Sequence, residues 1–228
     1  MPYLLRRRQT ELLEHMDDPH CDLERLERTY SQFSVVNQLV AGWQLVYRRF
    51  LRPLMVRQPI SLLDIGSGGG DVARQLAHWA RRDGLELRLT LADPDGRAFR
   101  YAKSRALPPN VRLVRGHSRD LANAGERFDV VTSNHLLHHL SKAELKGLCQ
   151  DSAQLARHLA LHNDICRSDL AYLGFALTWP LFRKSFITAD GLRSIRRSYT
   201  PAELAKVAPS AWRVETFAPY RNLLLWTP

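Results

Sequence analysis

The chain has 228 residues, of which 45% are hydrophobic and 25% charged, an ordinary composition for one globular domain with an appended element. Its three cysteines, Cys21, Cys149 and Cys166, form an odd set without CxxC or Cys/His spacing. This pattern argues against a disulfide framework and a cysteine-based zinc site. The net charge of +10 can indicate binding to nucleic acid, anionic membranes or acidic ligands, but arginines scattered over a solvated surface are the favoured explanation.

No segment predicts export or a membrane span. Arg6, Arg7 and Arg8 are followed by "QTELLEHMDD", which is too polar for the core of a secretion signal. The longest apolar stretch, "LAYLGFALTWPLF" at 170–182, contains Pro180 and is shorter than the roughly 20 residues that span a bilayer. We therefore expect a reduced, cytoplasmic protein.

The N-terminal part predicts helices. Apolar residues recur from Leu23 to Phe50 at steps of three and four, which places them on one face of a helix. We expect a break at 31–37 and an end before Pro53, because the residue before proline is pushed out of helical geometry. Residues 1–55 are predicted to form an N-terminal helical cap.

The rest of the chain, 56–228, alternates short apolar runs with helical ones, which predicts an α/β domain with a mostly parallel sheet. Helices with marked starts are expected at "SKAE" and "TPAE", where a hydroxyl precedes a glutamate by three residues. The segment 165–199 is too long for a plain connection, so we expect a helical insertion there. The expected strands are 60–65, 87–92, 111–115, 128–133, 158–163, 212–217 and 222–226, and the expected helices 71–82, 95–106, 142–156 and 201–208.

The first strand ends in "LLDIGSGGGD" at 62–71, a turn that lets backbone approach a ligand. A phosphate loop is excluded, because Asp71 and Val72 stand where Lys-Ser/Thr is required. A dinucleotide fingerprint fits only formally, through Gly68, Gly70 and Ala73. The remaining interpretation is an acid before a GxGxG, Asp64 with Gly66, Gly68 and Gly70, and a second acid, Asp93, after the next strand.

The two acids favour a cationic ligand without phosphate. A carboxylate at Asp64 would repel a pyrophosphate but suits the charged amino acid moiety of S-adenosylmethionine. Asp93 can accept hydrogen bonds from ribose hydroxyls, and Pro94 offers an apolar face to adenine. The alternative for "DPD" is a simple helix start, which aspartate and proline favour by themselves.

"LLDIGSGGGD", "LADPD", "VRLVRGHSRDL" and "FDVVTSNHLLHHL" resemble successive motifs of class I S-adenosylmethionine-dependent methyltransferases, over about 60–164. The likeness is to small-molecule, quinol-methylase-like enzymes, and "LHNDICRSDLAYLGF" resembles a bacterial subgroup associated with aromatic polyketides or quinones. The resemblance implies a Rossmann-like seven-stranded sheet with helices on both faces. It also implies cofactor contacts at Asp64, Gly66, Asp93, Pro94, His117, Ser118, Ser133 and Asn134. His117 departs from the aspartate or asparagine that is common in the family.

Methyl transfer to oxygen needs a base, and histidine is the usual side chain near neutral pH. His135, His138 and His139 would share one side of a helix after the fourth strand, and Asp164 ends the fifth strand. These four are the catalytic candidates, although histidines here also pack structurally in this fold. No metal site is expected, because no carboxylate or cysteine stands at ligand spacing beside the histidines. The acceptor-binding candidates are Tyr30, Phe33, Tyr47, Arg167, Trp179 and Arg197. The alternative for the aromatic residues among them is that they pack in the hydrophobic core.

We expect methyl transfer from S-adenosylmethionine to a small aromatic, phenolic or quinol-like acceptor, with oxygen as the favoured acceptor atom. The alternatives are C-methylation, an RNA or DNA methyltransferase, and a binding module that keeps the fold without activity. The sequence "SNHLL" disfavours the nucleic-acid alternative, because base amino methylation favours Asn/Asp-Pro-Pro-aromatic there. A membrane-surface contact through "LAYLGFALTWPLFRK" is compatible with the sequence, as is a monomer or a dimer.

Overall fold

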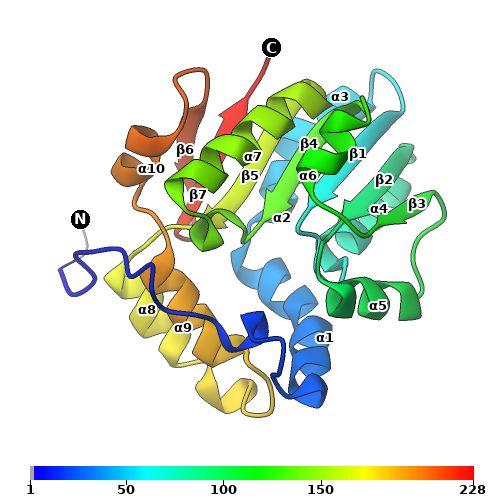
Figure 1. Ribbon diagram of the computed structural model, residues 1–228. Coiled ribbons are helices and arrows are strands. Elements are labelled where there is room, and N and C mark those ends of the chain that lie inside the picture. Colours follow the sequence, from blue (N-terminus) through cyan, green and yellow to red (C-terminus); the bar gives the residue numbers. More distant parts are fainter. Residues whose placement is uncertain (1–2) are drawn as a thin grey trace.

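The computed structural model describes residues 3–228, apart from the side chain of Leu39. Seven strands form one sheet in the order β3-β2-β1-β4-β5-β7-β6 (Figure 1). Strands β1 to β5 pair in parallel, and β7 runs antiparallel to both β5 and β6. The predicted Rossmann-like, mostly parallel sheet is confirmed. The strands are β1 (Ile60–Ile65), β2 (Leu87–Ala92), β3 (Val111–Val114), β4 (Phe128–Asn134), β5 (Ala156–Ile165), β6 (Arg213–Phe217) and β7 (Arg221–Trp226).

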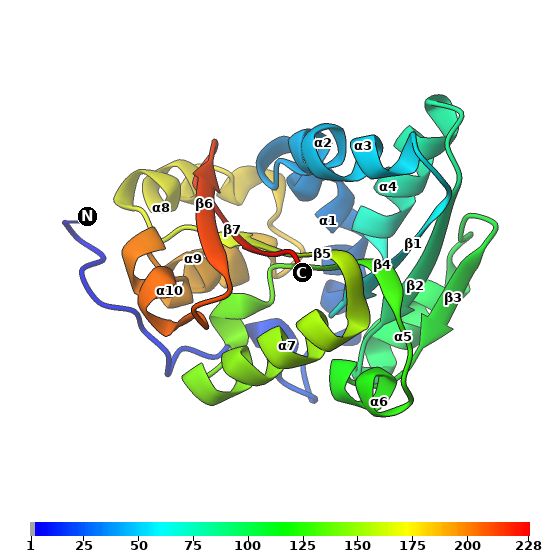
Figure 2. The same cartoon turned by 90° about the horizontal axis from the view of Figure 1, so that it is seen from above.

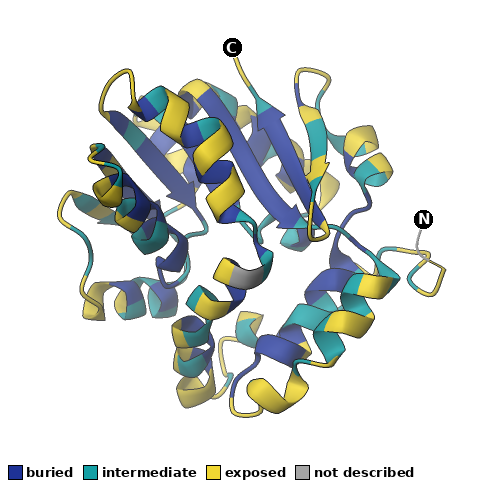
Figure 3. Ribbon diagram, turned by 180° about the vertical axis from the view of Figure 1, so that it is seen from behind, coloured by how far each residue is buried: buried dark blue, intermediate teal, exposed yellow. Residues whose placement is uncertain are grey.

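Helices cover both faces of the sheet (Figure 2). Successive side chains of a strand point to opposite faces, so Leu62 joins the core under α4 while its neighbour Leu63 joins the core under α7. Figure 3 shows the central strands largely buried between these layers, whereas the edge strands β3 and β6 contain only half-buried and exposed residues. The helices of the two layers are α4 (Asp71–Arg82), α5 (Gly96–Ser104), α6 (Ser118–Asn123), α7 (Lys142–Leu155) and α10 (Pro201–Val207).

The two predicted helix starts are confirmed. The Ser141 and Thr200 hydroxyls accept the backbone N–H of Glu144 and Glu203, and each glutamate accepts the backbone N–H of its capping residue. Helix α6 was not predicted, because its six residues are too few to show a periodic pattern.

Two expectations for the N-terminal cap are wrong. Helix α1 (Leu23–Val40) is continuous through 31–37, because the Ser31 and Ser34 hydroxyls bond back to carbonyls of their own helix rather than ending it. The second helical run also passes Pro53. After α2 (Trp43–Val46) a π-helical turn, Tyr47–Leu51, leads into α3 (Arg52–Met55), and this change of hydrogen-bond pattern just before Pro53 lets the run continue past the proline.

The insertion and the N-terminal segment lie together with α1 beyond the carboxyl ends of the parallel strands (Figure 1). The insertion contains α8 (Asp169–Ala176), a short 3-10 turn at Trp179–Leu181 and α9 (Ile187–Arg197). The Asp169 carboxylate accepts the backbone N–H groups of Leu4 and Leu5, and Gln9 N–H donates to the Arg196 carbonyl. Two segments far apart in the sequence thus form one layer over the sheet edge.

Across residues 3–228, none of the helices combines the length and apolar character that crossing a bilayer requires.

Candidate active site

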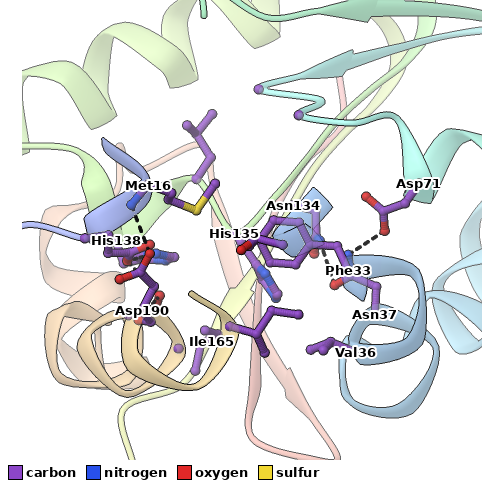
Figure 4. Close-up of a pocket in the computed structure, with 18 of the residues that line it drawn as sticks. Met16, Phe33, Val36, Asn37, Asp71, Asn134, His135, His138, Ile165 and Asp190 are labelled. Atoms are coloured by element: carbon purple, nitrogen blue, oxygen red, sulfur yellow. Dashed lines mark hydrogen bonds and ion pairs between the residues drawn. The ribbon is translucent and has the colours of Figure 1, made fainter. Parts of the chain in front are cut away.

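A cavity of about 630 Å³ lies between the carboxyl edge of the sheet and the layer formed by α1, α8, α9 and the N-terminal segment (Figure 4). Its size is in the range of small-ligand sites. One side is built from the glycine turn and the ends of β1 and β2, and the other from histidines, acids and apolar side chains. The predicted residues that line it are Asp64, Gly66, Gly68, Asp93, Pro94, Asn134, His135, His138, His139, Tyr30 and Phe33.

The glycine turn is tied to the end of β2. Gly66 and Gly68 have φ values of 66° and 53°, in the left-handed region that favours glycine. Gly66 N–H donates to the Ala92 carbonyl, and Gly68 N–H donates to Asp93 Oδ2, both at 2.8 Å. Nothing lies within 4 Å of where a Cβ of Gly68 would be, so its backbone is open to a ligand.

Asp64 is a buried carboxylate without a cationic partner among the described residues. Thr132 Oγ1 donates to it at 3.2 Å, and its exposed fraction is 2%. Burial raises the pKa of its carboxyl to about 7, because the charged form loses hydration. An unpaired acid that lines a cavity fits a ligand that brings its own positive charge, such as an ammonium or sulfonium group, and does not fit a pyrophosphate.

Asp93 holds the turn and faces the same cavity. Its two carboxylate oxygens accept the N–H groups of Gly68 and Asp95, at 2.8 and 2.9 Å. Burial nevertheless raises the pKa of this carboxyl above its usual range. Each oxygen keeps a second lone pair for ligand hydroxyls, and Pro94 lies beside it in the cavity wall.

Polar side chains continue from the glycine turn across the cavity floor. Asn37 Nδ2 donates to Asp71 Oδ2 at 2.7 Å, and Asn134 Nδ2 donates to Asn37 Oδ1 at 3.1 Å. Figure 4 shows Asn37 between the other two. The sequence reasoning missed Asn37, since an asparagine inside a helix carries no signal of such a contact.

His135 is held as a neutral ring. Arg221 Nη1, which can only donate, lies 2.8 Å from His135 Nε2, so Nε2 accepts and the ring proton is on Nδ1. Burial and the charge of Arg221 hold the pKa of His135 well below its usual range. His135 also has a φ of 55°, a strained conformation that is concentrated at functional sites. With its lone pair occupied, this ring is a hydrogen-bond donor to the cavity rather than a base.

His138 lies between two carboxylates. Its Nδ1 is 2.7 Å from Asp164 Oδ1, and its Nε2 is 3.2 Å from Glu14 Oε1. Burial opposes the charge of the ring, but the two acids outweigh it and raise the pKa of His138 to about 9. Asp164 also accepts the backbone N–H of His138, at 2.8 Å, so this acid orients the histidine. The pKa of Asp164 is lowered by the same pairing, against its burial.

His139 continues the cluster at the cavity wall. Its Nδ1 is 3.3 Å from Asp17 Oδ2, and its Nε2 is 3.8 Å from Glu14 Oε1. Residues Leu137–His139 form a 3-10 turn rather than the expected helix, and the ring centroids of His138 and His139 are 4.3 Å apart. Sequence reasoning missed Glu14 and Asp17, because the fold alone brings the N-terminal segment to these histidines.

Several candidates lie outside the lining of this cavity. Tyr47 packs on Trp79 and donates to Asp83 in the core under α4. Arg167 is buried, with its guanidinium on the Ser198 carbonyl and Glu203. Ser118 donates to Asp151, and Ser133 bonds to His162. Gly70, His117, Trp179 and Arg197 are also absent from the lining.

A Rossmann-like sheet whose first strand ends in this glycine turn, with buried acids facing the cavity, fits an adenosine ligand without phosphate. Comparison with known proteins points to methyltransferases. Residues 62–159 match the family described as "Methyltransferase domain". A curated relative, the ubiquinone biosynthesis O-methyltransferase of Azorhizobium caulinodans, is 36% identical over 99 residues. That match covers 42% of this chain and 36% of the relative's length.

Solved structures share the fold. A putative O-methyltransferase from Nostoc punctiforme superposes with a TM-score of 0.57 at 15% identity, over 87% of this chain and 60% of that one. The plantazolicin methyltransferase BpumL, in complex with SAH, gives 0.56 at 14% identity, over 90% and 87% of the two chains. Residues 62–159 are therefore similar to a methyltransferase domain, and these solved structures share the Rossmann-like fold of the chain.

Proposed function

We propose that the protein is an S-adenosylmethionine-dependent methyltransferase. It transfers the methyl group of this cofactor to an oxygen atom of a small aromatic acceptor of phenolic or quinol-like type. The observation that carries the proposal is a shared cavity, whose lining includes both the glycine turn and a largely apolar part with a histidine and acid cluster in its wall. Methyl transfer is an in-line displacement, so a shared, enclosed space for both reactants is what the reaction requires.

The cofactor side is formed by Asp64, the glycine turn and Asp93. In this proposal Asp64 pairs with the cationic amino acid part, the backbone of Gly66 and Gly68 approaches it closely, and Asp93 binds the ribose hydroxyls. The unpaired state of the Asp64 carboxylate supports this arrangement.

The acceptor side is largely apolar, which suits an aromatic ring. Phe33 and Val36 from α1 face Ile165 at the end of β5 across the cavity (Figure 4). Phe175 from α8 and Ile195 from α9 complete the wall.

The bound cofactor supplies the methyl group: the acceptor oxygen forms the new C–O bond as the S–CH3 bond breaks, and the bonding pair leaves on sulfur. The acceptor hydroxyl also loses its proton, and His139 is the member of the Glu14, His138 and His139 cluster that accepts it, because His138, with its pKa raised to about 9, is already protonated at neutral pH. His135, whose Nδ1–H points away from Arg221, donates a hydrogen bond that positions the acceptor.

Oxygen is preferred over carbon because the curated relative is named an O-methyltransferase. C-methylation remains the second candidate, since a phenolate activates its ring carbons as well as its oxygen.

Calorimetry with S-adenosylmethionine and S-adenosylhomocysteine, followed by turnover with a panel of phenols and hydroquinones, tests the proposal. We expect saturable binding and a methyl ether identified by NMR. A carbon-methylated product would select the second candidate. Binding without turnover of any acceptor would favour a module that keeps the fold without activity, and absence of cofactor binding would refute the whole assignment.

A further inference from the structure

Three ligand-type atoms converge in the wall of the acceptor compartment. Glu14 Oε1 lies 3.2 Å from His138 Nε2 and 3.8 Å from His139 Nε2, and the candidate ligand atoms of the three residues lie within 4.8 Å of one another. Around a tetrahedral zinc ion with bonds of about 2.0–2.2 Å, ligand atoms are about 3.4 Å apart. The two distances from Glu14 Oε1 to the histidine Nε2 atoms therefore lie on either side of the ligand–ligand distance expected around zinc.

Each histidine of the cluster has a carboxylate near its Nδ1 atom. Asp164 Oδ1 is 2.7 Å from His138 Nδ1, and Asp17 Oδ2 is 3.3 Å from His139 Nδ1. Histidines that bind metal ions nearly always donate their second ring nitrogen to a carboxylate or carbonyl, which orients the ring and raises its basicity. Here the same arrangement occurs twice and directs both Nε2 atoms toward Glu14.

One atom of the cluster lacks a hydrogen bond although it is deeply buried. The exposed fraction of His138 is 1%, and its Nε2 has no hydrogen-bond partner of adequate geometry among the described residues. The nearest carboxylate oxygen is Glu14 Oε1, at 3.2 Å, and this oxygen also accepts the Ser194 hydroxyl at 2.7 Å. Buried polar atoms without partners are rare and call for an explanation, and a bound cation supplies one.

We propose that Glu14, His138 and His139 bind one divalent transition-metal ion, with Zn²⁺ as the expected ion. Two histidines and one glutamate are a known catalytic zinc set, with a fourth position left for water or substrate. All three residues line the cavity, so the open position faces the acceptor compartment. The expectation of no metal site considered only acids close in sequence, and Glu14 reaches the histidines through the fold.

A metal ion here would act on the acceptor as a Lewis acid. An acceptor hydroxyl bound at the open position would lose its proton more readily, to solvent water rather than to the three ligands, whose lone pairs the ion occupies, and this would assist its attack on the methyl group. This use of the ion rests on the proposed function, whereas the binding of the ion does not.

Metal binding is measured without acceptor or turnover. Zn²⁺ is titrated by calorimetry into chelator-treated protein, and Co²⁺ replaces it for absorption spectra. We expect one ion per chain, and at least about tenfold weaker binding for Glu14→Gln and for His139→Gln. The control is His158→Gln, which alters another partly exposed histidine beside a carboxylate, with Nε2 3.8 Å from Asp129, and should bind as wild type.

Folding of each variant is checked by circular dichroism and thermal unfolding in chelator. If a variant fails to fold, ring-nitrogen NMR shifts of wild-type His138 and His139 on Zn²⁺ addition answer the same question. The proposal is overturned if wild type binds no stoichiometric ion, if both folded variants bind as tightly as wild type, or if Co²⁺ shows a sulfur charge-transfer band. Any of these would leave the cluster as a metal-free proton acceptor and the proposed function intact.

Discussion

Asp93 combines two tasks, because it anchors the glycine turn and faces the cavity. We expect Asp93→Ala to weaken S-adenosylhomocysteine binding by about tenfold to a hundredfold, the range for hydrogen bonds to a charged group. Calorimetry measures the effect.

The matched control is Asp129→Ala. Asp129 also accepts a backbone N–H from a neighbouring strand, that of Ser61 at 2.7 Å, but at the opposite edge of the sheet. Unchanged binding in Asp93→Ala would mean that the cofactor lies elsewhere.

Asp64 predicts a pH dependence of cofactor binding. Burial raises the pKa of this carboxyl to about 7, and a cationic ligand binds its charged form, so binding below pH 7 must first expel a proton. Affinity should therefore rise with pH, by up to about tenfold per unit below pH 7, and level off above it. Calorimetry in chelator over this range checks the slope, which Asp64→Asn should abolish. A wild-type affinity independent of pH would contradict the pairing of Asp64 with a cation.

At the level of elements, α8 and the 3-10 turn after it expose an unusual amount of apolar surface. Leu170, Leu173 and Leu177 are spaced along one side of this segment, and Leu177 is 81% exposed. Arg183 and Lys184 follow it and are also exposed. Apolar side chains flanked by basic ones are typical of helices that lie on anionic membranes.

We therefore expect the protein to float with anionic vesicles in a density gradient, and the double variant Leu173→Ser, Leu177→Ser to lose this property. The double variant Leu45→Ser, Val56→Ser, which changes exposed apolar residues elsewhere, is the control. A wild-type protein found only in the dense fractions would contradict the membrane contact.

Most elements of the sheet domain were predictable because local signals agreed. The apolar runs mark the strands, and the hydroxyl–glutamate pairs at Ser141 and Thr200 mark helix starts. The glycine turn and Asp93 were equally visible, as contiguous motifs. By contrast, the cluster of Glu14, His138 and His139 depends on a long-range contact, and Tyr47 shows that helical periodicity cannot say whether an aromatic side chain faces a cavity or the core.

For the whole molecule, the net charge of +10 does not gather into one basic block in the sequence. Arginines pair with acids at separate places, such as Arg49 with Glu215 and Arg112 with Glu126. Binding to nucleic acid depends on neutralising many adjacent phosphates, which dispersed and partly paired arginines do poorly. We expect no gel shift of structured RNA even at low salt. A salt-sensitive shift would revive the nucleic-acid alternative.

The layer over the sheet edge has a consequence for how related proteins are compared. The family match covers 62–159, whereas Phe33 and Val36 of the acceptor compartment precede it and Ile165, Phe175 and Ile195 follow it. Similarity within the matched segment therefore reports mainly on the glycine turn and the histidines, which lie inside it. We expect the apolar part of the proposed acceptor compartment to differ with the flanking segments, and exchanging those segments between relatives should change which acceptor is methylated.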